Sequence, residues 1–469
     1  MQTYDGLLAA VTAHEGQTQE VRDPATGAVI GHAPVHSVEA VDRAIETAAA
    51  AAASWAAISD ADRAALLHRA ADAVEAHADA LVELLSREQG KPLNGPNARF
   101  EVGACAVWLR AAADTPHPNH EIINDESGRA TMHYRPIGVV AAITPWNWPL
   151  MIAIWQIAPS LRMGNTVVQK PSEYTPLSGL ALVRILNTVL PEGVLQSVSG
   201  GGDLGARLTS SPKVGKIMFT GSTATGKKII EASAEHVTRL TLELGGNDAG
   251  IVLPDVDAKA IAPDLFWGAF INTGQTCAAL KRLYVHDSVY DEVVAELVAF
   301  ARTVPMGVGL EEQNELGPLQ NKMQYDIVDR LVQSAIDSGA TIECGGNPER
   351  EAPGFFYPTT IVSNIDPHNP LVVEEQFGPA LPVVRFSDLD EALVLANELE
   401  VGLGASVWSS DREKALDVAA RMESGTVWIN GHGGLHPMIP FGGAKQSGYG
   451  KEFGAEGLKA VAVAQVVSG

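Results

Sequence analysis

Two patterns of apolar positions divide the chain. From Ser37 to Trp55 and from Asp60 to Arg87, apolar residues recur at helical spacing, which predicts amphipathic helices. Further along, short β-branched runs alternate with amphipathic stretches. The runs are 138–144, 165–170, 193–199 and 216–221, and helices are expected after Pro149, Pro176, Asp203 and Thr223. Strand–helix units at this spacing are typical of parallel βαβ crossovers and predict a doubly wound α/β sheet.

A second alternating series begins after Glu243. Its apolar runs are 249–253, 281–286, 340–344, 358–362, 380–386, 404–409 and 425–430, with helices expected at 317–337, 388–398 and 411–423. We therefore predict a second α/β lobe that joins the first near residue 245. The polar, alternating stretch 117–135 and the C-terminal end are expected to be strands that pair outside the lobes. Edge strands of this kind often find a partner in another subunit.

Composition narrows the class of protein. Of 469 residues, 46% are hydrophobic and 19% are charged, which favours packed cores over disorder. The net charge of −23, with no block of Lys or Arg, argues against binding to nucleic acid or to an anionic membrane. The three cysteines lie far apart, which suits a reducing compartment, and the N-terminus lacks the features of a signal peptide. We therefore expect a cytoplasmic protein.

One uncharged segment, Ile137–Leu161, is long enough to span a bilayer. It contains Pro145, Pro149 and Pro159, and a helix exposed to lipid would leave backbone groups unpaired at these breaks. The segment therefore predicts a strand, a loop and a buried helix.

No metal site is expected. The sequence contains no CxxC, HExxH or EF-hand pattern. His432 and His436 stand four residues apart, but in a Gly/Pro-rich loop, so they favour a loop lining over a pair of ligands.

Three residues are candidates for chemistry, each with a structural alternative. Cys277 follows a Gly-containing turn after an apolar helix, where N–H groups could favour a nucleophilic thiolate, but most lone cysteines are small buried hydrophobes. Glu243 ends a β-branched run and is followed after one residue by two glycines. This position indicates either a general base or a solvated or capping acid. Asn147 lies between two tryptophans and two prolines. This position indicates either a rigid donor to an oxyanion or a side chain that forms a local turn hydrogen bond.

The stretch 219–228, FTGSTATGKK, predicts a strand, a glycine turn and a helix. Gly221 and Gly226, with Ser222 and Thr223 at the start of the helix, suit a dinucleotide phosphate. The pattern is neither G-x-G-x-x-G nor a Walker A motif, so by itself it equally indicates a simple βα turn.

Taken together, the motifs resemble those of the aldehyde dehydrogenase superfamily. They are TPWNWP, QKPSE, FTGST, LELGGND, NTGQTC, EEQFGP and PFGGAKQSG, in that order between residues 144 and 448. The resemblance implies an α/β fold with a Rossmann-type cofactor domain, a second α/β catalytic domain and a small β oligomerisation arm. The implied boundaries are 1–115 and 137–244 for the dinucleotide-binding domain, 245–448 for the catalytic domain, and 116–136 with 449–469 for the oligomerisation strands.

The resemblance also implies catalytic roles. Cys277 resembles the nucleophile, and Asn147 with the Cys277 N–H resembles the oxyanion hole. Glu243 resembles the base that activates water for thioester hydrolysis, with Glu452 as its partner in a proton relay. Gln156 departs from the family, in which Lys is frequent beside the tryptophan, and this puts a relay through that position in doubt. Relatives that pass the thioester to coenzyme A usually lack Glu243, so its presence favours release of a free acid.

The remaining implied site residues bind the cofactor or line the substrate tunnel. The cofactor residues are Ile143, Thr144, Trp146, Lys170, Glu173, Gly202, Gly205, Gly221, Ser222, Leu244, Glu375 and Phe377. Glu173 favours NAD because its carboxylate would repel the extra phosphate of NADP, although some members with Glu there accept both. The tunnel residues are Trp148, Ile152, Trp155, Thr276, Ala278 and Phe441, with the loop 431–438 at its mouth.

These walls are apolar or small, which favours a neutral aliphatic or aromatic aldehyde, since a semialdehyde carboxylate would require a cation. The alternatives are a semialdehyde dehydrogenase, an acyl-transferring or phosphate-reducing relative that uses the same cysteine, or a binding protein that has lost the reaction. The resemblance further implies a homodimer or homotetramer.

Overall fold

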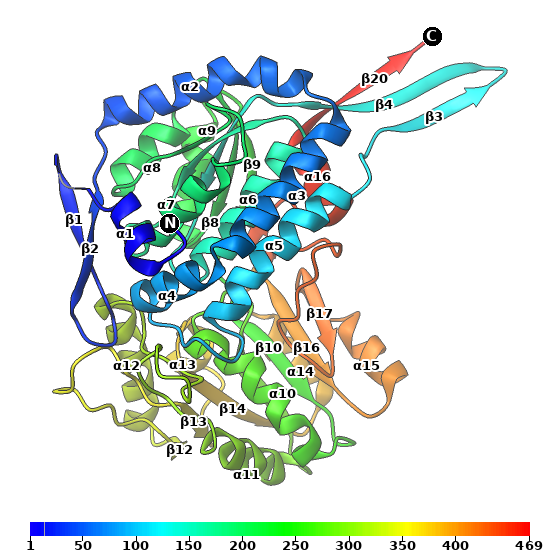
Figure 1. Ribbon diagram of the computed structural model, residues 1–469. Helices are drawn as coiled ribbons and strands as arrows, with labels where there is room; N and C mark the ends of the chain where they lie inside the picture. Colours follow the sequence, from blue (N-terminus) through cyan, green and yellow to red (C-terminus); the bar gives the residue numbers. More distant parts are fainter. Residues whose placement is uncertain (14) are drawn as a thin grey trace.

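The computed structural model describes residues 1–13 and 15–469. It has two α/β lobes and a projecting β arm (Figure 1). The first lobe is built on a sheet with the strand order β19-β9-β8-β5-β6-β7, parallel except for β19. Its strands are β5 (Val139–Ile143), β6 (Thr166–Lys170), β7 (Leu195–Ser197), β8 (Val214–Thr220), β9 (Arg239–Glu243) and β19 (Gly448–Tyr449).

Helices cover both faces of this sheet because its central strands are apolar on both faces. On β5, Val139, Ala141 and Ile143 face one core cluster, and Val140 and Ala142 face another. The first cluster includes α2 (Val38–Ala57), α8 (Gly202–Thr209) and α9 (Thr223–Ser233). The second includes α1 (Tyr4–Val11), α3 (Asp60–Ala76), α4 (Ala78–Gln89), α5 (Ala98–Asp114), α6 (Pro149–Arg162), α7 (Pro176–Leu186) and α16 (Gly454–Ala460).

The second lobe contains a sheet with the order β12-β13-β14-β11-β10-β16-β17, parallel except between β12 and β13. The strands are β10 (Asp248–Val252), β11 (Leu280–His286), β12 (Thr341–Cys344), β13 (Thr360–Ser363), β14 (Ala380–Phe386), β16 (Gly404–Trp408) and β17 (Thr426–Ile429). One face packs on α10 (Ala258–Phe270) and α11 (Tyr290–Ala301); the other packs on α12 (Lys322–Asp337), α13 (Pro370–Val373), α14 (Leu389–Asn397) and α15 (Arg412–Ala419). The predicted α/β class is confirmed.

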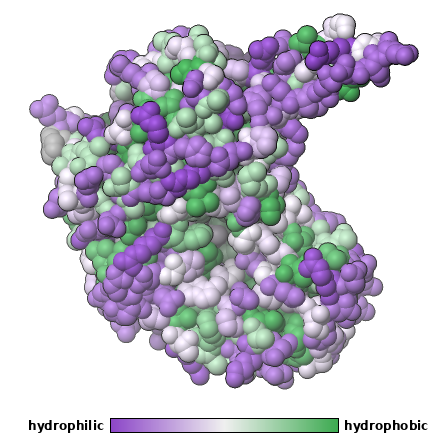
Figure 2. All heavy atoms as spheres, turned by 45° about the vertical axis from the view of Figure 1, so that its right-hand side comes forward, coloured by the Kyte–Doolittle hydropathy of each residue, from purple (hydrophilic) through white to green (hydrophobic). Residues whose placement is uncertain are grey.

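The arm is a sheet with the order β20-β4-β3 that extends away from the lobes (Figure 1). It contains β3 (His120–Asp125), β4 (Gly128–Pro136) and β20 (Ala462–Ser468). Figure 2 shows that hydrophilic residues cover most of it, among which Ile122, Ile123, Val466 and Val467 are exposed. Of the predicted oligomerisation segment 449–469, β20 lies in the arm, whereas α16 packs against α6 in the first lobe.

Several elements differ from the sequence prediction. The periodic stretch 60–87 is two helices, because the chain breaks at His77 between α3 and α4. The predicted helix 317–337 begins at Lys322, after the N-cap Asn321, whose side chain accepts from the Gln324 N–H. The hairpin of β1 (Thr18–Arg22) and β2 (Val29–Pro34) was not predicted. A minor antiparallel pair joins β15 (Val401–Gly402) and β18 (Ala444–Lys445).

The uncharged segment 137–161 forms β5, a loop and α6, as predicted. Within residues 1–13 and 15–469, none of the helices combines the length and apolar character needed to cross a membrane.

Candidate active site

The carboxyl ends of the parallel strands in the first sheet open onto two adjoining cavities. β5 ends at Ile143, β6 at Lys170, β8 at Thr220 and β9 at Glu243. In doubly wound sheets, ligands bind outside this edge. The larger cavity has a volume of about 810 Å³ and the smaller one about 300 Å³, and Trp146 belongs to the wall that they share.

The smaller cavity brings together residues from both lobes. It is lined by Pro145, Trp146, Asn147, Thr220, Gly221, Ser222, Glu243, Leu244, Gly245, Cys277, Met323, Gln324, Ile327, Glu375 and Phe377. The three candidates for chemistry, Cys277, Glu243 and Asn147, therefore line one cavity, although they are far apart in the sequence.

Cys277 follows a strained turn. In the 3-10 helix η1 (Ile271–Gly274), Asn272 and Thr273 have φ angles of 50° and 56°. A left-handed conformation costs about 1–3 kcal/mol per non-glycine residue and persists only where the surroundings hold it. Here the Thr273 hydroxyl donates to the Gly317 carbonyl at 3.2 Å and accepts from the Gly317 N–H at 3.0 Å. The turn before the thiol is therefore held by the segment that precedes α12.

The surroundings of Cys277 favour a neutral thiol. Burial raises the pKa of Cys277 to about 12, and the opposing effect comes from the ammonium of Lys281. Lys281 Nζ donates to the Cys277 carbonyl at 2.5 Å. The sequence predicts that turn N–H groups favour the anion, and no local pattern points to Lys281. Among the described residues the Cys277 N–H has no hydrogen-bond acceptor, which leaves it available as an oxyanion donor.

Asn147 is held on both its backbone and its side chain. Its carbonyl accepts from Lys91 Nζ at 2.8 Å and from Asn272 Nδ2 at 2.9 Å. Its own Nδ2 donates to the Gln275 carbonyl at 3.0 Å. A side-chain amide has two N–H donors, so this single bond orients the group and leaves one donor for a ligand.

A buried ion pair lies behind Asn147. Lys91 Nζ lies 2.5 Å from Glu101 Oε2, and both side chains are fully buried. The other Glu101 oxygen accepts from the N–H groups of Leu150 and Met151, at 2.8 and 3.1 Å, where α6 begins. Lys91 Nζ also lies 3.6 Å from the centre of the Trp148 ring. This ion pair could not be predicted from the sequence, because Lys91 and Glu101 contact residues that are distant in the chain.

Glu243 and Glu452 form a pair of buried carboxyl groups. Neither oxygen of Glu243 has a hydrogen-bond partner within the part of the chain that the structure describes. Burial raises the pKa of Glu243, and the negative charge of Glu452 raises it further. Burial also raises the pKa of Glu452, to about 8, against the opposing charge of Lys216.

The position where the family often has lysine holds a neutral amide here. Gln156 Nε2 donates to the Thr220 hydroxyl at 3.1 Å, and its Oε1 has no partner among the described residues. A buried lysine, Lys216, lies on β8. Lys216 Nζ donates to the Thr241 hydroxyl at 2.7 Å, and burial lowers the pKa of Lys216 to about 7.

Most of the predicted cofactor residues line the larger cavity. These are Ile143, Thr144, Trp146, Lys170, Glu173, Gly202, Gly205, Gly221 and Ser222, whereas Leu244, Glu375 and Phe377 line the smaller cavity beside Cys277. Two helices, α8 at Gly202 and α9 after its N-cap Ser222, begin at the larger cavity, and helix N-termini favour phosphate groups. The volume and these donors fit a dinucleotide. Lining residues that the sequence analysis missed include Arg207, Thr225, Lys228 and Met323.

None of the predicted tunnel residues lines the cavity that contains Cys277. Trp148, Ile152, Trp155, Ala278 and Phe441 are buried in one core cluster, against which Cys277 packs. Thr276, the sixth, accepts from Trp148 Nε1 at 2.9 Å.

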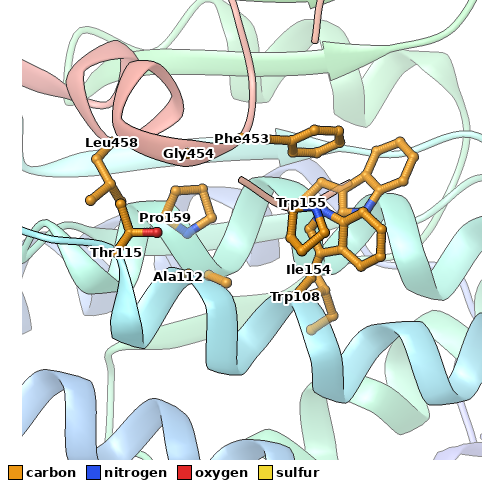
Figure 3. A pocket seen from close by; sticks show the side chains of 11 residues that line it. Trp108, Ala112, Thr115, Ile154, Trp155, Pro159, Phe453, Gly454 and Leu458 are labelled. Carbon is orange, nitrogen blue, oxygen red and sulfur yellow. The ribbon is translucent and has the colours of Figure 1, made fainter. Parts of the chain in front are cut away.

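Of these residues, Trp155 lines a small enclosed space. Figure 3 shows it beside Trp108 and Phe453, whose rings lie 5.8 and 4.9 Å from it. The cavity measures about 20 Å³, room for about one water molecule. Neither tryptophan N–H has a partner among the described residues. Three aromatic rings therefore line this space together with mostly aliphatic residues, and two of the rings carry an indole donor that is free within the described part of the chain.

The loop histidines do not form a ligand pair. The His432 side chain is fully buried, with Nδ1 2.9 Å from the Ser406 hydroxyl and Nε2 3.5 Å from Asp248. His436 Nδ1 accepts from the Met438 N–H at 3.2 Å. Across residues 1–13 and 15–469, no three His, Cys, Asp or Glu side chains are grouped so that they could hold a metal ion.

The two sheets, the dinucleotide-sized cleft and the cysteine between the lobes define a nucleotide-binding α/β enzyme. The model of the aldehyde dehydrogenase family matches residues 11–467, and the chain belongs to that family. It is an oxidoreductase of aldehydes, and the family uses NAD or NADP.

Known relatives align with nearly the whole chain. Phenylacetaldehyde dehydrogenase of Pseudomonas fluorescens is 40% identical over 96% of this chain and 92% of its own. PnpE from Pseudomonas sp. WBC-3, solved with nicotinamide adenine dinucleotide, is 37% identical with a TM-score of 0.93, over 98% of this chain and 95% of its own. Betaine aldehyde dehydrogenase of Staphylococcus aureus, solved with NAD+, is 31% identical with a TM-score of 0.93, over 99% and 95%.

Proposed function

We propose that this aldehyde dehydrogenase converts its substrate to the free acid through a thioester on Cys277. The sulfur attacks the aldehyde carbonyl, and the resulting oxyanion accepts hydrogen bonds from the second Asn147 N–H and from the Cys277 N–H. NAD, when bound, accepts the hydride that leaves the substrate carbon. Glu243 then takes a proton from water, which hydrolyses the thioester. Both carbonyl additions use one anion site.

One observation carries this proposal: Cys277, Asn147 and Glu243 line one cavity of about 300 Å³ together with Glu375 and Phe377. The unpartnered Glu243 carboxyl and its raised pKa suit a general base. Glu452 and Lys216 lie behind Glu243 as the route by which its proton leaves, and Gln156 has no ionisable group to take part.

The test is a stopped-flow measurement of NADH formation with Cys277→Ser. Wild-type enzyme is expected to show a burst, and the Ser variant is expected to lose both the burst and turnover. Cys344→Ser is the matched control, because this half-buried thiol lies on β12 and its replacement should leave the burst intact. Turnover that survives Cys277→Ser would refute the covalent route, and product formation that requires coenzyme A would replace hydrolysis by acyl transfer.

For the cofactor we propose NAD, held as the resemblance implies. Lys170 and Glu173 would hold the adenosine ribose, Gly221 and Ser222 the pyrophosphate, and Glu375 with Phe377 the nicotinamide ribose. Replacing Glu173 by Gln removes the charge that opposes a 2′-phosphate. The ratio of kcat/KM for NADP to that for NAD should therefore rise, and an unchanged ratio would contradict the role of Glu173.

For the substrate we propose a neutral apolar aldehyde, aliphatic or aromatic. The buried apolar cluster against which Cys277 packs, which includes Trp148, Ile152 and Phe441, supports this choice, as does the 40% identity to a phenylacetaldehyde dehydrogenase. Steady-state kinetics on hexanal, benzaldehyde and succinic semialdehyde would decide the question. A clear preference for the semialdehyde would favour the alternative of a semialdehyde dehydrogenase.

We further propose the domain boundaries and the assembly given by the resemblance. The arm of β3, β4 and β20 exposes Ile122, Ile123, Val466 and Val467, which suits pairing with a second subunit in a homodimer or homotetramer. Sedimentation of a chain truncated before β20 would test this role. We propose a cytoplasmic location from the cysteine usage alone.

A further inference from the structure

Lys281 joins the nucleophile to a residue of the proposed cofactor site. It is the second residue of β11, and its side chain is only 2% exposed. Its Nζ donates to the Cys277 carbonyl at 2.5 Å and lies 3.1 Å from Glu375 Oε1. The same Glu375 oxygen accepts from the Gly246 N–H at 3.3 Å. One buried ammonium thus contacts both the turn that carries the thiol and the carboxylate that lines the same cavity.

Apart from Lys281, the described residues whose charges act most strongly on Cys277 are acidic. Glu243 at the end of β9, Asp248 at the start of β10, and Glu375 after α13 each disfavour its thiolate, and Lys281 on β11 is the cation that favours it. Since a thiol must ionise to act as a nucleophile, the source of positive charge determines how readily this one reacts.

We propose that Lys281 is the cation that favours ionisation of the Cys277 thiol, and that the Glu375 carboxylate weakens this effect because it pairs with the Lys281 ammonium. The inference rests on the proposed function, in which Cys277 is the nucleophile and Glu375 holds the nicotinamide ribose. In this ionisation the S–H bond breaks, the electron pair stays on sulfur, and the proton passes to water. Lys281 does not exchange a proton with the sulfur, so it is a positioning residue.

The geometry sets the size of the effect. The carbonyl oxygen and the sulfur of one cysteine are four bonds apart, so Lys281 Nζ lies within about 7 Å of Sγ. At an effective dielectric constant of about 20, a unit charge at that distance shifts a pKa by about one to two units. Glu375, at 3.1 Å from the ammonium, cancels part of this shift.

The test is the pH dependence of alkylation by iodoacetamide, measured on enzyme without cofactor in a Cys344→Ser background. Lys281→Met is expected to raise the kinetic pKa of the thiol by about one to two units, and Lys281→Arg to restore most of the wild-type value. Glu375→Gln is expected to shift the pKa in the opposite direction, downward. Circular dichroism and the melting temperature identify the variants that fold.

Lys170→Met is the matched control. Lys170 is also buried and lies in the larger cavity, so its loss should leave the thiol pKa unchanged in the absence of cofactor. Equal pKa values for the Lys281→Met and Lys170→Met enzymes, or an upward shift with Glu375→Gln, would overturn the inference. Aldehyde turnover is measured in parallel. An inactive wild-type enzyme whose thiol still responds to Lys281→Met would refute the proposed function and leave this inference standing.

Discussion

Replacing Lys91 by Met should destabilise the protein, because Lys91 pairs with Glu101, and should slow the reaction, because Lys91 also holds the Asn147 carbonyl. The substitution leaves the Glu101 carboxylate buried without its partner, which typically costs about 3–5 kcal/mol. An unfolding entropy of about 2.1 cal/mol/K per residue gives about 1 kcal/mol/K for a chain of this length, so the melting temperature should fall by about 3–5 °C. The double variant with Glu101→Gln should recover part of this loss, because the amide oxygen can still cap α6 and no charge is stranded.

The catalytic effect has a separate assay. Without Lys91 the Asn147 carbonyl keeps only the bond from Asn272, so the oxyanion donor loses part of its orientation. We expect a slower burst of NADH with an unchanged Kd for NAD, and a smaller slowing in an Asn147→Ala background, because interacting sites are not additive.

The exposed pair between Lys213 and Glu46 supplies the control. Lys213→Met should cost no more than about 1 kcal/mol. A Lys91→Met enzyme that melts like the Lys213→Met enzyme, or that slows equally with and without Asn147, would refute the reasoning.

Three further predictions concern the oxyanion hole, the base and the turn. Asn147→Ala should slow the NADH burst on the order of a hundredfold or more, because it removes one oxyanion donor, and a burst within threefold of wild type would contradict that role. Glu452→Gln removes a negative charge that raises the pKa of Glu243, so the pH below which thioester hydrolysis slows should move downward in single-turnover profiles; an upward move would contradict the pairing. Gly274→Ala should lower the melting temperature more than Gly339→Ala: both glycines have positive φ, but the added carbon meets a backbone oxygen at 2.3 Å only at Gly274.

Periodic, local signals predicted most of the fold. The strand runs 138–144, 165–170 and 216–221 became β5, β6 and β8, whose residues are buried on both faces of the sheet. Local signals failed where tertiary contacts decide. The break at His77 carries no Gly or Pro, and the β1–β2 hairpin is short and only partly buried.

The candidate site divides in the same way. Cys277, Glu243 and Asn147 stand in compact motifs that a sequence displays directly, and they share one cavity. Lys91 and Glu101 stand in no such motif, and Glu101 is recognised only by its hydrogen bonds to the start of α6. No sequence pattern distinguishes these charged residues from those on the surface, because burial follows only from the packing of several helices.

The lysines around the cavity indicate how an acidic chain stabilises the anions that form during the proposed reaction. The chain carries a net charge of −23, and burial raises the pKa values of Cys277, Glu243 and Glu452, so the resting site holds few stabilised anions. Each of these groups would form an anion during the proposed reaction. A buried lysine opposes the shift at the thiol, Lys281, and at the second carboxyl group, Lys216, and the half-buried Lys451 opposes it at Glu243. Because the two buried lysines lie on different sheets, in β11 and β8, neutralising Lys281 should change acylation and neutralising Lys216 should change hydrolysis.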